Sequence, residues 1–247
     1  MNILDMELKL LGGFPINVHG IPIYSIKLTD IIEKIGYTKY NMIVDILCID
    51  DDLIKKYMNP NITGEYLFWY IYDTFYRKTE FYEELTTDDV LKYFKILFKT
   101  DVVFNENLGF VVNGKFAINN KNYYEFQNII KYRNCLNDIG NINDDNPADE
   151  RTKKLIEKRN KLRKKVQKQK SESDDPLTMA DLISIFSEAE HMIISDVCDN
   201  YDIYQFNNQF NRLKIMGDFH VNIQALLAGA KSEEEPKHWL SKIDAQN

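Results

Sequence analysis

The side chains that could do catalytic or metal chemistry are few and lie far apart in this sequence. The histidines are scattered: His19, His191, His220 and His238. None has a cysteine, an acid or a second histidine at the spacing of a zinc site. Phosphate-binding glycine loops, nucleophile elbows and kinase-type motifs are not found. We therefore expect a protein that is not an enzyme and that needs neither a metal nor a cofactor.

The cysteines and the apolar runs bear on the compartment of the chain. The cysteines are odd in number, far apart and without a CxxC pair: Cys48, Cys135 and Cys198. This pattern favours a reducing compartment over a disulfide framework. The N-terminus lacks a basic leader, and no apolar run approaches the roughly 20 residues that span a bilayer. We expect a soluble protein with no membrane partner.

The amide-rich segment at residues 201–243 is a better functional lead. Its apolar residues recur at helical spacing: Ile203, Phe206, Phe210 and Leu213. The face between them carries uncharged amides, which suit hydrogen bonding to a partner or to another helix. We predict a contact surface with these partner-binding candidates: Tyr204, Phe206, Gln209, Phe210, Arg212, Leu213 and Trp239. Alternatives stay open for two of them, because Arg212 could pair with upstream acids and Trp239 could cover the helical module.

A second aromatic group, between Tyr66 and Tyr82, contains the further candidates Trp69 and Tyr70. Its aromatic side chains surround one expected helix, which is more than a single buried stripe requires. Two interpretations stay open. The group forms a core with a rim of tyrosines, or it lines a groove in which Tyr and Trp anchor a partner.

Residues 151–170 carry a local charge of +10 in a chain whose net charge is −7. A possible basic docking face is formed by Lys158, Arg159, Lys161, Arg163, Lys164 and Lys165. This segment is interpreted as a solvated connecting helix or as a docking element for an acidic partner. Nucleic-acid binding is a third interpretation, although the segment lacks the interleaved aromatics that stack on bases.

The remaining patterns predict a helix-dominated α+β protein with small antiparallel hairpins. Hairpins are expected at residues 14–26 and around Asn113-Gly114. Gly36 interrupts a helix that then resumes to Ile49, and a glycine signal at Gly229 ends the amide-rich helix. Helix starts are predicted at Thr63 and at these capping pairs: Asp30 with Glu33, Thr86 with Asp89, Asn122 with Glu125, and Thr178 with Asp181.

These elements divide the chain into three parts. Residues 1–136 form the α+β N-terminal domain, and residues 137–176 form a charged linker with a basic helix at 148–170. Residues 177–247 form an all-helical C-terminal module. Within that module the polar stretch 191–200 is expected to be poorly helical.

Several phrases of the sequence occur in a recognisable order: an extended start that ends in PIYSIKLTDIIEKIGYTKY, then DVVFNENLGFVVNGKFAINNKNYYEFQNIIK, NPADERTKKLIEKRNKLRKK, LTMADLISIF, YDIYQFNNQFNRL, ALLAGAK and KHWLSKI. Together they resemble a family of tail assembly chaperones and tail-morphogenesis proteins from tailed bacteriophages of low-GC Gram-positive hosts. The polar stretch HMIISDVCDN departs from the family pattern.

The resemblance implies a role in building the phage tail. Such proteins bind the long helical tape-measure protein, around which tail-tube subunits assemble, and are usually absent from the finished particle. In several phages a frameshift adds the second domain, and the break would then fall in residues 137–176. Tape-measure and tail-tube proteins would be the partners in the host cytoplasm, and a homo-oligomer is possible.

Three hypotheses follow. The chain is a tail assembly chaperone, a structural component of the virion such as a neck, tail or baseplate protein, or a nucleic-acid-binding module that uses the basic helix. The absence of base-stacking aromatics makes nucleic acid the least favoured partner.

Overall fold

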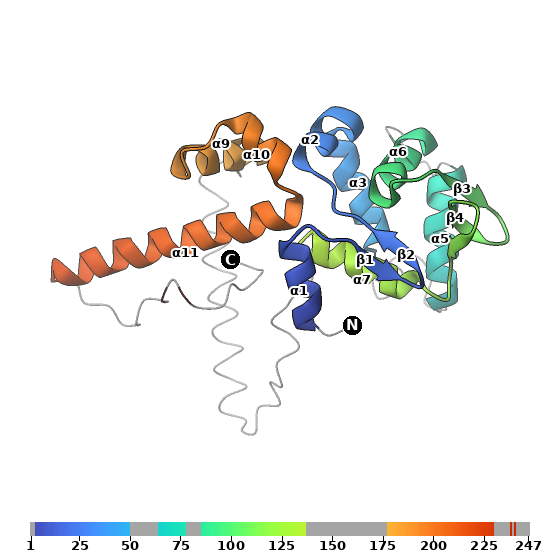
Figure 1. The fold of residues 1–247 in the computed structure, drawn as a ribbon, viewed down its shortest axis with the longest axis horizontal. Helices are drawn as coiled ribbons and strands as arrows, with labels where there is room; N and C mark the ends of the chain where they lie inside the picture. The colour runs from blue at the N-terminus through green and yellow to red at the C-terminus, as the bar shows by residue number, and fades with distance from the viewer. Residues whose placement is uncertain are drawn as a thin grey trace, which may run out of the picture.

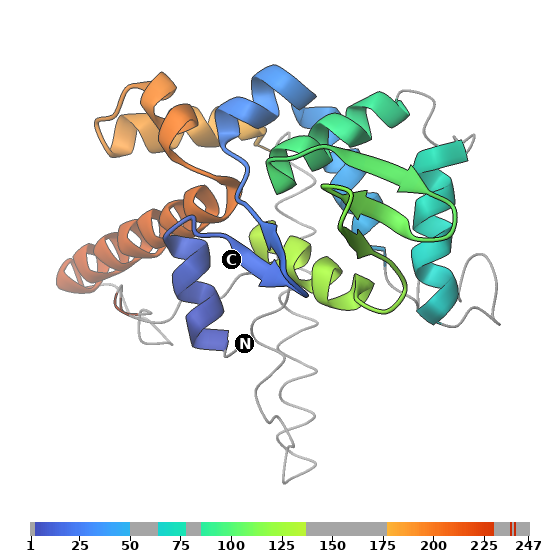
Figure 2. The ribbon, with the colours of Figure 1, turned by 45° about the vertical axis from the view of Figure 1, so that its right-hand side comes forward.

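The computed structural model describes residues 3–49, 64–77, 85–136 and 177–229, together with residues 238 and 240. Most of these residues lie in helices, and two small antiparallel sheets complete the fold, so the predicted helix-dominated α+β class is confirmed. Figures 1 and 2 place the three-stranded sheet and α5 at one end of the protein and the long helix α11 at the other.

The described elements follow one another in this order: α1 (Ile3–Leu11), β1 (Ile16–Val18), β2 (Ile21–Ile23), α2 (Leu28–Asp30), a single π-helical turn η1 (Ile31–Ile35), α3 (Tyr37–Leu47), α5 (Gly64–Arg77), α6 (Thr87–Phe98), β3 (Val102–Asn105), β4 (Gly109–Val112), β5 (Phe116–Ile118), α7 (Tyr123–Arg133), α9 (Met179–Ala189), α10 (Ile194–Asn200) and α11 (Ile203–Leu227).

Both predicted hairpins are present. Strands β1 and β2 are antiparallel, and Ile16 lies opposite Ile23. Strands β4 and β5 are also antiparallel, and Val112 lies opposite Phe116. At the second turn Asn113 and Gly114 have φ values of 52° and 63°. These positive values are those of the tight hairpin turn that the dipeptide predicts.

The turn between β3 and β4 ends at a position that only glycine can occupy. Gly109 has a φ of 89°. A Cβ atom there would lie 2.3 Å from the carbonyl oxygen of Ile118 and 2.7 Å from Cζ of Phe68. Glycine therefore allows the sheet and the aromatic face of α5 to approach closely.

An aromatic cluster centred on Phe110 joins α5, α6 and the three-stranded sheet. The Phe110 ring lies 5.0 Å from that of Phe94, 5.3 Å from those of Phe68 and Phe104, and 5.6 Å from that of Tyr72. These separations are typical of favourable aromatic pairs. The aromatic residues of α5 thus supply much of the core at this end of the protein.

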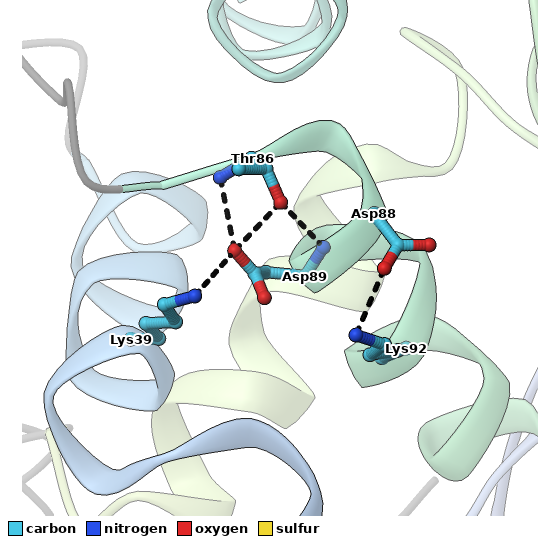
Figure 3. A network of polar contacts seen from close by, with 5 residues as sticks. All are labelled: Lys39, Thr86, Asp88, Asp89 and Lys92. Atoms are coloured by element: carbon cyan, nitrogen blue, oxygen red, sulfur yellow. Dashed lines mark hydrogen bonds and ion pairs between the residues drawn. The ribbon is translucent and has the colours of Figure 1, made fainter.

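The start of α6 forms the predicted capping box. The backbone N–H of Asp89 donates to Thr86 Oγ1, and the backbone N–H of Thr86 donates to the Asp89 carboxylate. The same carboxylate accepts a hydrogen bond of 2.8 Å from Lys39 Nζ of α3 (Figure 3). A neighbouring ion pair of 2.8 Å joins Lys92 to Asp88. One buried acid therefore both caps α6 and ties it to α3.

Two predicted capping pairs are wrong. The first helix after the hairpin begins at Leu28, whose N–H donates to the carbonyl of Tyr201, and Asp30 instead forms an ion pair with Lys34. Helix α7 does begin at Tyr123, but Asn122 makes no cap.

The side chains of the α7 pair are used elsewhere. The Asn122 side chain accepts from the Asn119 N–H and donates to the Ala117 carbonyl, which stabilises the loop before α7. Glu125 lies 3.4 Å from His19 of the first hairpin turn. At both helix starts, the side chains therefore form hydrogen bonds or ion pairs with neighbouring groups and do not cap the first turn of the helix.

One helix was not predicted, and another was expected to be poorly formed. Residues Ile3–Leu11 form α1, which buries Met6 and Leu10 and packs against α11. The polar stretch 191–200 contains α10, which buries Val197. In α10 a small apolar face packs against other elements and overrides the polar composition.

The C-terminal helices pack directly on the N-terminal part. One hydrophobic core continues from Leu10 and Ile16 to Phe186 and Phe206. The N–H of Leu28 donates to the Tyr201 carbonyl at 3.0 Å, and Lys27 Nζ donates to the carbonyl of Asn200. The predicted linker 137–176 lies outside the described residues, so the domain boundaries stay a prediction.

Candidate partner-binding site

Helix α11 begins with a capping box that the sequence analysis did not use. Asp202 Oδ1 accepts from the N–H of Gln205 at 2.8 Å, and the Gln205 side chain accepts from the Asp202 N–H at 3.1 Å. Gln205 also donates to the carbonyl of Leu11 at 2.8 Å. The first turn of α11 is therefore fixed to the end of α1.

The predicted cap of α9 by Thr178 and Asp181 is confirmed.

The proximal half of α11, residues 203–215, is part of the core. Phe206 is fully buried, and its ring lies 5.4 Å from that of Phe186 of α9. Ile203 and Tyr204 are also buried, and Phe210 and Leu213 pack against the core. The helical spacing of these apolar residues is thus used within the protein.

The distal half of α11, residues 216–227, is much more open. Leu227 is 83% exposed and Leu226 is 38% exposed. Met216, Phe219 and Ile223 are half-buried, with the Phe219 ring 4.9 Å from that of His238. In Figures 1 and 2 this half projects away from α1 and α7.

Five distal residues form one side of the helix, here called the distal stripe: Met216, Phe219, Ile223, Leu226 and Leu227. Their spacing of three and four residues is that of the contact positions in helix pairs. The exposed amides Asn222 and Gln224 border the stripe. Nearby, the exposed Lys214 and Asp218 carry opposite charges. The distal half therefore presents apolar side chains between uncharged hydrogen-bonding groups.

The sequence-predicted candidates fall into separate places. On α11, Tyr204 and Phe206 are buried, Phe210, Arg212 and Leu213 are half-buried, and Gln209 is exposed. Trp69 and Tyr70 are half-buried on α5, at the opposite end of the protein. Trp239 and the basic face formed by Lys158, Arg159, Lys161, Arg163, Lys164 and Lys165 lie outside the described residues.

The placement of Trp69 fits the interpretation of its group as core with a rim. Its ring lies 4.9 Å from that of Phe68 and 5.4 Å from that of Tyr72, both of which are buried. Tyr66 and Tyr76 are exposed at 62% and 43% and form the rim. The six candidates of the proximal half and the two of α5 therefore do not come together in one surface.

The distal stripe was missed, although a signal for it is present. The predicted apolar spacing ends at Leu213, just after the run of amides. The intervals from Met216 to Phe219, Ile223 and Leu226 are three, four and three residues, which is the repeat of a helix-pairing seam. Gly217 follows the first of these positions. Because glycine is unfavourable within helices, this residue argues against a helix that continues through the repeat.

Burial changes the ionisation of several groups near the start of α11. It raises the pKa of the Asp202 carboxyl, against the opposing effects of the Gln205 N–H, the Arg133 charge, Ser25 and Lys27. Burial also raises the pKa of Tyr204 to about 12 and that of Cys135 to about 11. The tyrosine and the thiol are therefore neutral at pH 7 and suited to packing rather than to nucleophilic chemistry.

Within the described ranges, no group of three or more histidine, cysteine or acidic residues is arranged to hold a metal ion. The helices of the same ranges include none with the length and apolar character needed to cross a membrane. The distal stripe, in which Leu226 and Leu227 are exposed, is the candidate site among the described residues.

Residues 167–244 match the family model of the YomV second domain. The name of this family is derived from a phage protein. The match includes α9, α10 and α11 and covers less than half of the chain. No curated protein and no solved structure matches the chain. Over its C-terminal part the chain is therefore similar to the YomV second domain, which is consistent with a phage protein.

Proposed function

We propose that the chain is a non-enzymatic phage tail assembly chaperone or morphogenesis factor. In this proposal it binds the tape-measure protein in the host cytoplasm through the distal stripe of α11 and helps tail-tube assembly. The observation that carries the proposal is the exposure of Leu226 and Leu227 on a helix whose other half is buried. The phage-derived family match of the same helix supports it.

The chemistry of the distal stripe suits a helical partner. A long helical protein presents apolar residues at spacings of three and four, which can interdigitate with those of the stripe. The bordering amides Asn222 and Gln224 can donate and accept hydrogen bonds in several geometries. They also avoid the cost of burying a charge during binding.

The size of the stripe favours weak, reversible binding. Burying an exposed leucine side chain contributes about 1.5–3 kcal/mol. Association itself costs at least about 4 kcal/mol in lost freedom of motion. Leu226 and Leu227 therefore only roughly offset this cost, and the half-buried members supply the remainder. A chaperone that leaves before the particle is complete requires reversible binding of this kind.

Co-purification from infected cells tests the proposal. A tagged chain should recover the tape-measure protein, whereas purified mature virions should lack the chain. The opposite result would contradict the chaperone proposal: the tagged chain recovers no tape-measure protein, and purified virions contain the chain. That result would support the alternative of a virion structural component. Nucleic-acid binding by residues 151–170 is a separate proposal, tested by whether affinity falls with salt and with charge reversal at Lys164 and Lys165.

A further inference from the structure

A small cavity lies at the joint between α7, the segment after β2 and the first turn of α11. Its volume is about 10 Å³, and its lining includes Ser25, Tyr40, Arg133, Asn134, Asp202 and Tyr204. A volume of roughly this size accommodates the centre of one water molecule and is too small for an organic ligand.

Arg133 brings a buried charge with spare donors to this cavity. It is 6% exposed, and its Nη2 donates to the carbonyls of Phe14 at 3.1 Å and Ile23 at 2.8 Å. Its Nη1 and Nε have no hydrogen-bond partner among the described residues. Burial lowers the pKa of Arg133, whereas the charge of Asp202 raises it. A guanidinium in this position favours an additional acceptor.

Asp202 brings an acceptor to the same cavity. It is 2% exposed, and its Oδ1 is occupied by the cap of α11, where it accepts from Gln205 N–H at 2.8 Å. Its Oδ2 makes no hydrogen bond of normal geometry within the part of the chain that the structure describes, although the Ser25 hydroxyl lies near enough to lower the pKa of Asp202. The nearby Ser25 hydroxyl donates to the Gly13 carbonyl at 3.3 Å. Arg133 and Asp202 attract each other across the cavity without forming a direct hydrogen bond.

The charges decide which species fits between them. An anion would be attracted by Arg133 but repelled by Asp202. A cation would be attracted by Asp202 but repelled by Arg133. A neutral molecule that both accepts and donates satisfies both residues at once. We propose that the structure assigns this cavity to one ordered water molecule, which accepts from Arg133 and donates to Asp202 Oδ2.

This water site has a consequence for the position of α11. Arg133 is the last residue of α7 and holds the backbone before β1 and at the end of β2, whereas Asp202 caps α11. The water therefore links the N-terminal part to the first turn of α11 by charge-assisted hydrogen bonds. The inference does not depend on which partner the distal half binds.

A crystal structure of the full chain at a resolution that shows ordered water tests the site. We expect one density peak within hydrogen-bonding distance of Arg133 and of Asp202 Oδ2, unchanged after a soak in bromide, which serves as the probe for an anion. An empty cavity, a direct Arg133–Asp202 ion pair, or anomalous bromide density at this position would overturn the proposal.

A solution measurement complements the crystal. We expect a rotating-frame Overhauser cross-peak between water and the Hε proton of Arg133 in the wild-type chain. Absence of the cross-peak in the wild-type chain would contradict the assignment.

Discussion

The two halves of α11 both carry apolar residues at helical spacing, but the proximal half is richer in amides and the surroundings of the two halves differ. The proximal half, residues 203–215, is capped by Asp202 and buries Ile203, Tyr204 and Phe206 against α9 and the N-terminal part. The distal half, residues 216–227, leaves Leu226 and Leu227 exposed. Helical periodicity thus marks an apolar face in both halves, and only the tertiary structure decides which face remains available to a partner.

The largest expected difference between the halves is in stability. Phe206→Ala should reduce the free energy of unfolding by about 3–5 kcal/mol, because it creates a cavity in the core. The matched variant Phe219→Ala removes a half-buried ring and should cost about 1 kcal/mol or less. Urea denaturation followed by circular dichroism measures both. Equal losses would contradict the division of α11 into a buried and an open half.

The cap of α11 gives the next largest effect. Asp202→Ala removes the acceptor of the Gln205 N–H and should cost about 0.5–2 kcal/mol from the lost cap alone. Asp202→Asn keeps an equivalent cap and should cost less. Hydrogen exchange should show faster opening of the proximal half in the alanine variant. Equal protection in both variants would show that the cap does not hold this end of the helix.

Two buried acids should respond to pH in opposite directions. Burial raises the pKa of Asp202, so the folded state binds this proton more tightly than the unfolded chain does. The contribution of Asp202 to stability is therefore greatest below its ordinary pKa of about 3.9 and falls as pH rises to the raised value. The slope cannot exceed about 1.4 kcal/mol per pH unit. Comparing wild type with D202N across this window isolates the effect.

Asp89 provides the opposite control. Burial alone would raise its pKa, but the hydrogen bonds from Lys39 and Thr86 lower it overall. Its contribution to stability is therefore complete above its ordinary pKa and is lost as pH falls through the lowered value. The wild-type advantage over D89N should shrink on acidification, while that over D202N should grow. The same sign for both differences would refute one of the two assignments.

Gly217 lies near the start of the distal half, and its substitution should give the smallest change in stability. A Cβ atom added there meets no atom within 4 Å among the described residues. Gly217→Ala should therefore stabilise α11 by about 0.5–1 kcal/mol through higher helix propensity. The gain should appear as slower hydrogen exchange in residues 216–227. Unchanged or faster exchange would indicate that the distal half needs the flexibility of glycine.

Features determined by neighbouring residues were predictable from the sequence. The capping boxes at Thr86 and Thr178 and the turn at Asn113-Gly114 formed as expected, because their hydrogen bonds join residues only a few positions apart. The start at Leu28 was missed because its N–H bonds to Tyr201, far along the chain. Local patterns contain no information about such a distant acceptor.

The candidate site was only partly predictable for a related reason. The sequence indicated that α11 has an apolar face bordered by amides, and the helix is present. It could not indicate that α9 covers Phe206 while Leu227 stays exposed. The spacing of three and four residues in the distal stripe was present in the sequence, from Met216 to Leu226.

Binding of the tape-measure protein by two matched variants of α11 tests the central claim most directly. Leu227 belongs to the distal stripe, whereas Val221, which is 65% exposed, lies about 120° around the helix from it. We predict that Leu227→Asp weakens binding at least about tenfold and that Val221→Asp changes it less than about twofold. Equal effects of the two substitutions, or tape-measure binding that neither alters, would contradict the account.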